Sequence, residues 1–420
     1  MKKMIVMAVS VILIVLSILN VIPGEKNINY LIEPLYRTGS PQFMRSMGNL
    51  LGPALVDGNR VTDLQNGDEI FPAMLEAISK AQNTISFETY IYWSGEVGDK
   101  FSKAFSERAQ AGVKVYVLLD WVGCGKMNKD SLAEMKKAGV EVELYRPLRW
   151  YHLAHINNRT HRKILVVDGK IGFTGGVGIA DKWSGHAQDR DHWRDSHYRI
   201  EGPAVAQMQA VFMDNWTKTR SKVLHGDDYF PPLKKEGPAI AQVFKSSSRE
   251  GSESVRLMYL LSITSARKTI RIANPYFVPD DLTLQSLVAA KKRGVRVEII
   301  VPGSKIDAEI SRQASRSLWG NLLEAGIQIY EFQPTMFHCK VMIVDDIWVS
   351  VGSTNFDTRS FRLNDEANLN VLDESFAKKQ IVFFEQDKKR SKLISFKDWK
   401  RRLWGERGVE RLARLFRYQL

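Results

Sequence analysis

Residues 161–168 read HRKILVVD, and residues 338–345 read HCKVMIVD. Both octets follow the pattern H-x-K-x-x-x-x-D, in which four apolar residues separate the lysine from the aspartate. An apolar run that ends at Asp-Gly or Asp-Asp predicts a strand, a tight turn and a returning strand. The shared positions are His161, Lys163 and Asp168 in the first octet and His338, Lys340 and Asp345 in the second.

Strand geometry divides the roles of these residues. Side chains alternate along a strand, so a histidine and a lysine two positions apart project from one face. The aspartate falls at the turn, and we expect Asp168 and Asp345 to orient the motif while the histidines transfer protons. One H-x-K alone is weak evidence, but two octets 177 residues apart in equivalent places of a repeated chain indicate one shared site.

The order of predicted elements repeats around the octets, which indicates a duplicated unit. Helices alternate with strands, so we expect an α/β fold of two similar α/β/α sandwich halves with mixed sheets, related by a pseudo-twofold axis. The first half predicts helices at 70–82, 98–111 and 131–138 and strands at 84–92, 113–119 and 140–145; the second predicts helices at 254–266, 282–293 and 311–325 and strands at 269–273, 295–301 and 327–331.

Matching tripeptides support the duplication. Ala-Gly-Val at 111–113 and 138–140 corresponds to Arg-Gly-Val at 293–295 and Ala-Gly-Ile at 325–327. We expect the chain to divide into a membrane anchor (1–24), an irregular linker and domain entry (25–59), a first half (60–224), a connection (225–238), a second half (239–386) and a basic amphipathic tail (387–420).

The N-terminal segment has the character of a transmembrane helix. No charged residue occurs from Met4 to Ile22, about the length that crosses a bilayer. Bulky residues stand where a signal peptidase needs small ones, so we expect an uncleaved single-pass anchor. Lys2 and Lys3 favour a cytoplasmic N-terminus. Lys26 and Arg37, which follow the segment closely, weaken that inference, and the side of the membrane stays open.

Composition narrows the partners without choosing among them. The chain of 420 residues has a net charge of +13, which favours nucleic acid or anionic lipid. Cys124 and Cys339 match neither a disulfide framework nor a metal-ligand spacing, and we expect both to be free thiols. There is no H-E-x-x-H, so we expect neither a metal nor another cofactor.

Two H-x-K pairs at one interface suit phosphoryl transfer. Imidazole titrates near neutrality, so one ring can attack phosphorus and form a phosphohistidine while the other protonates the departing alkoxide. Lys163 and Lys340 would stabilise the charge on the phosphate oxygens.

At these residues the chain resembles the phospholipase D superfamily and, within it, the bacterial cardiolipin synthases. The similarity runs from about Asn66 to the C-terminus. The matching segments are FETYIY (87–92), THRK (160–163), GG (175–176) and WRD (193–195) in the first half, and NPYFVP (274–279), GSTNFD (352–357) and NDE (364–366) in the second.

The resemblance implies transfer of a phosphatidyl group between two phosphatidylglycerol molecules at the bacterial inner membrane, giving cardiolipin and glycerol. The alternative is a hydrolase of the same superfamily, either a phospholipase D or a nuclease, although the anchor makes lipid the expected partner. A catalytically dead membrane adaptor is a third reading, and the intact H-x-K pairs argue against it. The oligomeric state stays open.

The resemblance also implies supporting residues. It matches Asn355 and Glu366 to family positions, Glu366 as the support of a catalytic histidine. Asp195 is either the equivalent support of a first-half histidine or structural. Ser353 and Gly176 belong to the matched Gly-Ser and Gly-Gly pairs, and Gly178 stands where the family often has Asn. By analogy His161 is the nucleophile and His338 the general acid.

Two features have two readings each. The apolar 274–279 segment either lines an entrance for acyl chains or packs in the core. The tail from Lys388 to Arg417, dense in Lys and Arg with interspersed Trp and Leu, either lies on anionic lipid or packs on the domain with a solvated basic face.

Overall fold

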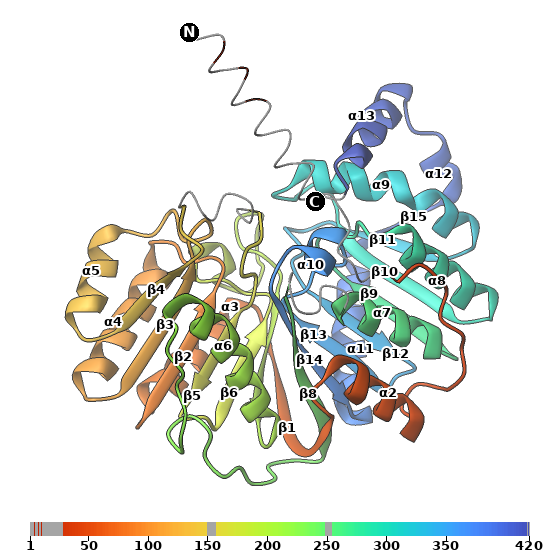
Figure 1. Ribbon diagram of the computed structural model, residues 1–420. Coiled ribbons are helices and arrows are strands. Elements are labelled where there is room, and N and C mark those ends of the chain that lie inside the picture. Colours follow the sequence, from red (N-terminus) through yellow and green to blue (C-terminus); the bar gives the residue numbers. More distant parts are fainter. Residues whose placement is uncertain are drawn as a thin grey trace.

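A computed structural model describes residues 28–148, 157–247, 254–417 and 419, together with Met4, Met7 and Ser10 (Figure 1). The rest of the predicted anchor therefore lies outside the described residues. Within the described part of the chain, no helix is both long enough and apolar enough to cross a bilayer.

One mixed sheet of fifteen strands runs through the described molecule. Its strand order is β15-β11-β10-β9-β12-β13-β14-β8-β1-β7-β6-β5-β2-β3-β4. The strands are β1 (Val56–Gln65), β2 (Thr84–Thr89), β3 (Lys114–Asp120), β4 (Glu141–Tyr145), β5 (Ile164–Val167), β6 (Ile171–Gly175), β7 (Ser196–Glu201), β8 (Ala239–Ser246), β9 (Thr269–Ala273), β10 (Arg296–Pro302), β11 (Gln328–Phe332), β12 (Val341–Val344), β13 (Trp348–Gly352), β14 (Glu366–Leu372) and β15 (Ser391–Ile394).

The two halves of the sheet repeat one topology. In the first half β2, β3 and β4 are parallel, and β5 lies antiparallel beside β2. In the second half β9, β10 and β11 are parallel, and β12 lies antiparallel beside β9. The halves are joined where β1 pairs with both β7 and β8. The repeated order of elements is thereby confirmed, and the pseudo-twofold axis stays a prediction.

Helices pack against both faces of each half of the sheet. They are α2 (Pro41–Leu51), α3 (Asn66–Ser79), α4 (Glu96–Gln110), α5 (Lys129–Lys137), the 3-10 turn η2 (Asp181–Trp183), α6 (Ala204–Arg220), α7 (Ser254–Ser265), α8 (Asp281–Lys292), α9 (Glu309–Glu324), α10 (Thr358–Arg362), α11 (Glu374–Lys389), α12 (Phe396–Lys400) and α13 (Trp404–Leu415).

Alternation along β3 shows the two buried faces. Val115 and Val117 pack in the apolar cluster that includes α3 and α4, whereas Tyr116 and Leu118 pack in the cluster that includes α6. Strands buried on both faces read as nearly continuous apolar runs, which is why the central strands were recognisable from sequence. Side chains of α6 and α11 share one core cluster with strands of both halves, so this cluster ties the halves together.

The four matched glycine tripeptides lie at the C-terminal ends of helices. Gly112 and Gly139 have φ values of 91° and 100°, and Gly294 and Gly326 have φ values of 94° and 82°. Each glycine directly follows the C-cap residue of a helix and turns the chain into the next parallel strand, a position where a left-handed conformation favours glycine. The duplication seen in the sequence is therefore a repeated helix-to-strand connection.

The linker expected to be irregular contains regular structure. α2 lies within it and packs Phe43 and Met47 into the core of the second half, and β1 begins at Val56. An apolar face hidden among Pro and Gly explains why this helix was missed. At the other end, the limit placed after residue 386 falls inside α11, and β15 adds the start of the tail to the sheet.

Candidate active site

The octets form the two predicted hairpins, β5–β6 and β12–β13. The strands, however, begin only at Ile164 and Val341, so the H-x-K triplets lie in the segments immediately before them. The prediction that His and Lys lie within the strand is therefore wrong. The triplets instead make hydrogen bonds with the opposite half.

Backbone pairing places each histidine against the other half. His161 N–H donates to Asp365 O over 2.8 Å, and Asp365 N–H donates to Arg159 O over 2.9 Å. The second octet does the same: His338 N–H donates to Arg194 O over 2.8 Å, in a short parallel bridge. Each H-x-K segment is thus held by the half that it does not belong to.

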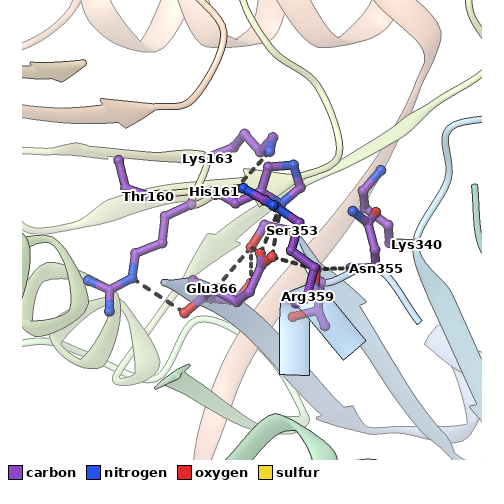
Figure 2. Close-up of polar contacts among 12 residues, drawn as sticks. Thr160, His161, Lys163, Lys340, Ser353, Asn355, Arg359 and Glu366 are labelled. Carbon is purple, nitrogen blue, oxygen red and sulfur yellow. Dashed lines mark hydrogen bonds and ion pairs between the residues drawn. The ribbon is translucent and has the colours of Figure 1, made fainter. Parts of the chain in front are cut away.

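The carboxylates that support the histidines are exchanged in the same way. His161 Nδ1 lies 3.0 Å from Glu366 Oε1 (Figure 2), and His338 Nδ1 lies 2.6 Å from Asp195 Oδ2. One of the two readings of Asp195 was that it supports a first-half histidine, as Glu366 would support a second-half one. That reading is wrong, because each carboxylate contacts the histidine of the opposite half. Since each carboxylate directly follows the residue whose carbonyl holds the histidine backbone, one strand edge fixes both ends of the imidazole.

Burial keeps the imidazole of His161 neutral. Its side chain is 12% exposed, and desolvation lowers its pKa to about 4, assisted by Lys163 and opposed by Glu366. Burial raises the pKa of Glu366, but His161 and Lys163 outweigh it and hold that pKa below its usual value. The neutral ring therefore carries its proton on Nδ1, which donates a hydrogen bond to Glu366, and Nε2 keeps a lone pair.

His338 has a different setting. Burial and the neighbouring Lys340 ammonium lower its pKa, while Asp195 acts against them. Its ring is surrounded by Trp183, Trp193 and Tyr276, with ring centroids 5.3–6.2 Å away.

The two lysines lie beside the histidines as the spacing predicted. Lys163 Nζ donates to His161 O over 2.8 Å, and Lys340 Nζ donates to His338 O over 2.7 Å while lying 3.1 Å from both ring nitrogens. Burial lowers the pKa of Lys163 to about 7 and that of Lys340 to about 8. Lys340 also disfavours the charged form of His161, so both octets act within one electrostatic site.

Glu366 is oriented by hydroxyl groups of its own half. Ser353 Oγ donates to it over 2.5 Å and Ser360 Oγ over 2.8 Å. Asn355 lies close to Lys340 in Figure 2, and its buried Oδ1 accepts no hydrogen bond among the described residues. Ser353 and Asn355 thus lie at the site. Ser360, in a short helix without motif character, was not anticipated.

Asp195 is oriented by other groups, and its surroundings explain why Gly stands at positions 176 and 178. Trp183 Nε1–H donates to it over 2.9 Å, and Ser196 N–H donates over 2.8 Å. A Cβ at Gly176 would lie 2.2 Å from Asp195 Oδ1, and one at Gly178 would lie 2.9 Å from the side chain of Ile91 and 3.1 Å from that of Trp183. The indole occupies the space that an Asn at 178 would need, and it supplies a donor.

Asp168 and Asp345 lie at the turns, and neither forms a hydrogen bond or ion pair with a histidine in the described part of the chain. Asp168 accepts hydrogen bonds from the backbone N–H groups of residues 82–84, and Asp345 accepts from those of residues 267–269. Both adopt positive φ, 52° and 51°, as the first residue of a tight hairpin turn. Each aspartate therefore joins its hairpin to the start of the neighbouring parallel strand, which is a structural task.

The sequence interpretation also missed a buried polar cluster next to the His161 segment. Glu88 accepts from Thr160 Oγ over 2.5 Å and from Asn215 Nδ2 over 2.7 Å, and burial raises the pKa of Glu88 to about 7. Thr160 directly precedes His161, so this cluster positions the catalytic segment from α6. An acidic residue inside the otherwise apolar β2 was the sequence feature that would have indicated it.

The remaining polar residues do not gather around a metal. Among residues 28–148, 157–247 and 254–417, no group of three or more His, Cys, Asp or Glu side chains is arranged to hold one. Cys124 and Cys339 are free thiols, as expected, and Cys339 is buried against Ser196 and Arg194 of the other half.

Comparison with known proteins agrees with this geometry. The family model "Cardiolipin synthase, PLD-like domain" matches residues 74–216 and 259–388, a stretch that includes both octets and both supporting carboxylates. A cardiolipin synthase of a Geobacillus species is 38% identical over 355 residues, covering 84% of this chain and 70% of the relative. The minor cardiolipin synthase ClsB of Bacillus subtilis is 34% identical over 84% of this chain and 87% of its own.

Solved structures share the fold at low identity. The phosphatidylserine synthase of Haemophilus influenzae superposes with a TM-score of 0.68 at 16% identity, covering 90% of this chain and all of that one. The polyphosphate kinase of Porphyromonas gingivalis superposes with a TM-score of 0.53 at 13% identity, covering 95% of this chain and 59% of that one. With the family match extending over both halves and the site assembled between them, the chain belongs to the cardiolipin synthase family of phospholipase D-like proteins.

Proposed function

We propose that this enzyme makes cardiolipin by moving a phosphatidyl group from one phosphatidylglycerol to the terminal glycerol hydroxyl of another. The observation that carries the proposal is the reciprocal site: each histidine of a pair is oriented by a carboxylate of the opposite half, so neither half holds a complete centre. Family membership supports phosphatidyl transfer between lipids over the hydrolytic alternative.

In the first step His161 is the nucleophile. Its neutral ring attacks phosphorus through Nε2 because Nδ1–H is bound to Glu366. An N–P bond forms, the P–O bond to glycerol breaks, and protonated His338 gives its Nε2 proton to the departing alkoxide. Asp195, 2.6 Å from Nδ1, stabilises the imidazolium that this requires.

In the second step the roles of the groups reverse. Neutral His338 takes the proton of the glycerol hydroxyl on the second lipid, whose oxygen attacks phosphorus as the P–N bond breaks. The products are cardiolipin and one free glycerol, and both histidines regain their starting protonation. Lys163 and Lys340 bind the non-bridging oxygens in both steps and stabilise the charge that grows there.

Water has to be kept from the intermediate for transfer to prevail over hydrolysis. The aromatic rings of Trp183, Trp193 and Tyr276 around His338 form an apolar wall beside the group that would activate water. We assign this wall a share in the preference for a lipid acceptor.

We further propose that the enzyme works at the inner membrane of a bacterium, tethered by the charge-free segment from Met4 to Ile22. A tether keeps a large catalytic domain at the surface where both lipid substrates are found.

The test is to incubate purified full-length protein with vesicles of phosphatidylglycerol and to follow cardiolipin, glycerol and phosphatidic acid together. We expect cardiolipin and glycerol in equal amounts. Phosphatidic acid accumulating without cardiolipin would replace the synthase by a phospholipase D, and no lipid turnover alongside cleavage of single-stranded DNA would indicate a nuclease.

A further inference from the structure

The C-terminal helix α13 is packed with its apolar face outward. It buries Glu410 and Ala413 against the domain, while Trp404 is 87% exposed, Leu412 62% and Leu415 73%. A surface helix of a soluble domain turns its leucines toward the core. In α13 the face that carries Glu410 packs on the domain, and the leucines point to the outside. The helix lies at the upper edge of the molecule, beyond α9 (Figure 1).

The orientation is held by a buried ion pair. Glu410 Oε1 accepts from Arg316 of α9 over 3.1 Å, and Glu410 Oε2 lies 2.8 Å from Arg402. A carboxylate buried without these partners would cost several kcal/mol, by the general penalty for an unpaired buried charge. The helix therefore cannot rotate its leucines inward without separating the buried Glu410 carboxylate from Arg316 and Arg402.

The short helix α12 fixes the connection to α13. Trp399 Nε1–H donates to Arg316 O over 2.8 Å, and the Arg402 guanidinium lies 3.9 Å from the centre of the Trp399 ring. The tail thus packs on the domain, one of the two readings of the sequence, and still leaves an apolar face uncovered.

Charge is distributed to suit an anionic surface. Residues 396–417 carry eight Lys or Arg and three Asp or Glu. Arg407, Arg411 and Arg414 follow one another at spacings of four and three, so they form a strip along the border of the apolar face. Glu410 is turned to the protein, which leaves basic side chains beside the exposed leucines.

The end of the tail reaches the neighbourhood of the active site. Arg417 pairs with Asp281, the first residue of α8, and Gln419 contacts Asn157 and Arg359. Arg359 belongs to α10, and Figure 2 draws it beside Glu366 and Ser353. A surface bound by α13 would therefore lie on the side of the molecule where Arg359 lies beside Glu366, the partner of His161.

We propose that α13, with Leu403 and Phe416 at its ends, docks in the headgroup region of a bilayer of anionic phospholipid. Trp404, Leu412 and Leu415 enter the boundary with the acyl chains, and the arginine strip binds lipid phosphates. The flanking positive charge favours this occupant over a second copy of the chain, whose identical helix would bring the arginines together. Docking does not rest on the catalytic proposal.

Docking of α13 can be measured by the quenching of Trp404 fluorescence. The full-length His161→Ala protein, which consumes no lipid, is mixed with vesicles of phosphatidylglycerol and phosphatidylcholine that carry brominated acyl chains, which quench tryptophan on contact. The same protein with Trp404→Phe supplies the background from the other tryptophans. We expect quenching in excess of that background, reduced at least threefold when phosphatidylglycerol is omitted or when the salt concentration is raised to 1 M.

Matched substitutions separate α13 from a general effect on folding. Leu412→Glu with Leu415→Glu should reduce the Trp404 quenching about tenfold, whereas Val382→Glu, on the exposed face of α11, should leave it unchanged. Equal quenching with and without Trp404 would overturn the proposal. A Leu412→Cys protein that forms a disulfide-linked dimer without lipid, and is not quenched with it, would assign the face to a second copy.

Discussion

Glu366 accepts a hydrogen bond from Nδ1–H of His161, although the two residues lie 205 positions apart and in different halves of the fold. Asp195 stands in the same relation to His338, 143 positions away. The two contacts are equivalent in topology but differ in their surroundings, since hydroxyls orient Glu366 and an indole orients Asp195. We therefore expect the two histidines to respond differently to substitution of their carboxylates.

Glu366→Gln should slow formation of the phosphoenzyme. The substitution removes the charge that keeps the Nδ1–H tautomer, which in comparable His–carboxylate pairs costs about 10²–10⁴ in rate. Rapid-quench measurement with headgroup-labelled phosphatidylglycerol gives the rate of glycerol release. Glu374→Gln, at an exposed site on α11, is the control and should react normally. A Glu366→Gln enzyme with an unchanged burst would show that His161 is not the nucleophile.

The leaving group should distinguish the two histidines. A phosphatidyl ester of p-nitrophenol needs no proton for departure, so His338→Ala should still release one equivalent of nitrophenol per site and then stall. His161→Ala should release none, because the nucleophile is gone. Absorbance in a stopped-flow instrument reads the burst, and His186→Ala, an exposed histidine, serves as control. The reverse pattern would exchange the assignments of nucleophile and general acid.

Activity should fall on both sides of a window set by buried groups. The pKa of His161 is about 4, so the neutral nucleophile is lost as the pH falls through that value. The general acid His338 has a pKa below the usual 6.5, so its proton is lost first as the pH rises. The pKa values of Lys163 and Lys340 are about 7 and 8, and each ammonium is lost in turn as the pH rises through its pKa. We expect kcat/KM for cardiolipin formation to be greatest above the His161 pKa of about 4 and below the usual imidazole value of 6.5, and to decline at higher pH.

Lys163→Arg tests the origin of the alkaline decline. Arginine stays charged throughout, so the part of the decline near pH 7 should disappear and leave the losses that belong to His338 and Lys340, even if the variant is slower overall. Lys170→Arg, on the exposed turn of the same hairpin, should keep the wild-type profile. A Lys163→Arg profile that coincides with the wild type would assign the decline to another group.

Asp168→Ala should destabilise the protein without altering the chemistry. The carboxylate accepts three backbone N–H groups and tolerates the positive φ, so its loss should lower the free energy of unfolding by about 1–3 kcal/mol. Asp168→Asn retains an acceptor and the conformation, and it should lose less. Urea unfolding measures the first effect and initial rates below the midpoint measure the second. A folded Asp168→Ala protein with a rate reduced by 10³ would restore a catalytic role.

Local sequence patterns were sufficient for most of the fold. The strand at 269–273 was predicted to the residue, and other central strands and helices within a few positions, because buried parallel strands and helix-ending glycines leave strong local patterns. The missed α2 lies in a segment rich in Pro and Gly. β15 was missed because its partner β11 is remote in sequence.

The sequence by itself predicted the reacting groups, because two octets with a histidine and a lysine at fixed spacing, inside a repeated α/β unit, indicate one shared site for phosphoryl transfer. Only the tertiary structure decided which carboxylate serves which histidine, that Asp168 and Asp345 bind backbone N–H groups, and that α13 turns Glu410 inward and its leucines outward. Spacing along a chain predicts which residues close in sequence project from the same face of a strand or helix. The contacts named above join segments 70 or more residues apart, so they depend on the packing of remote elements.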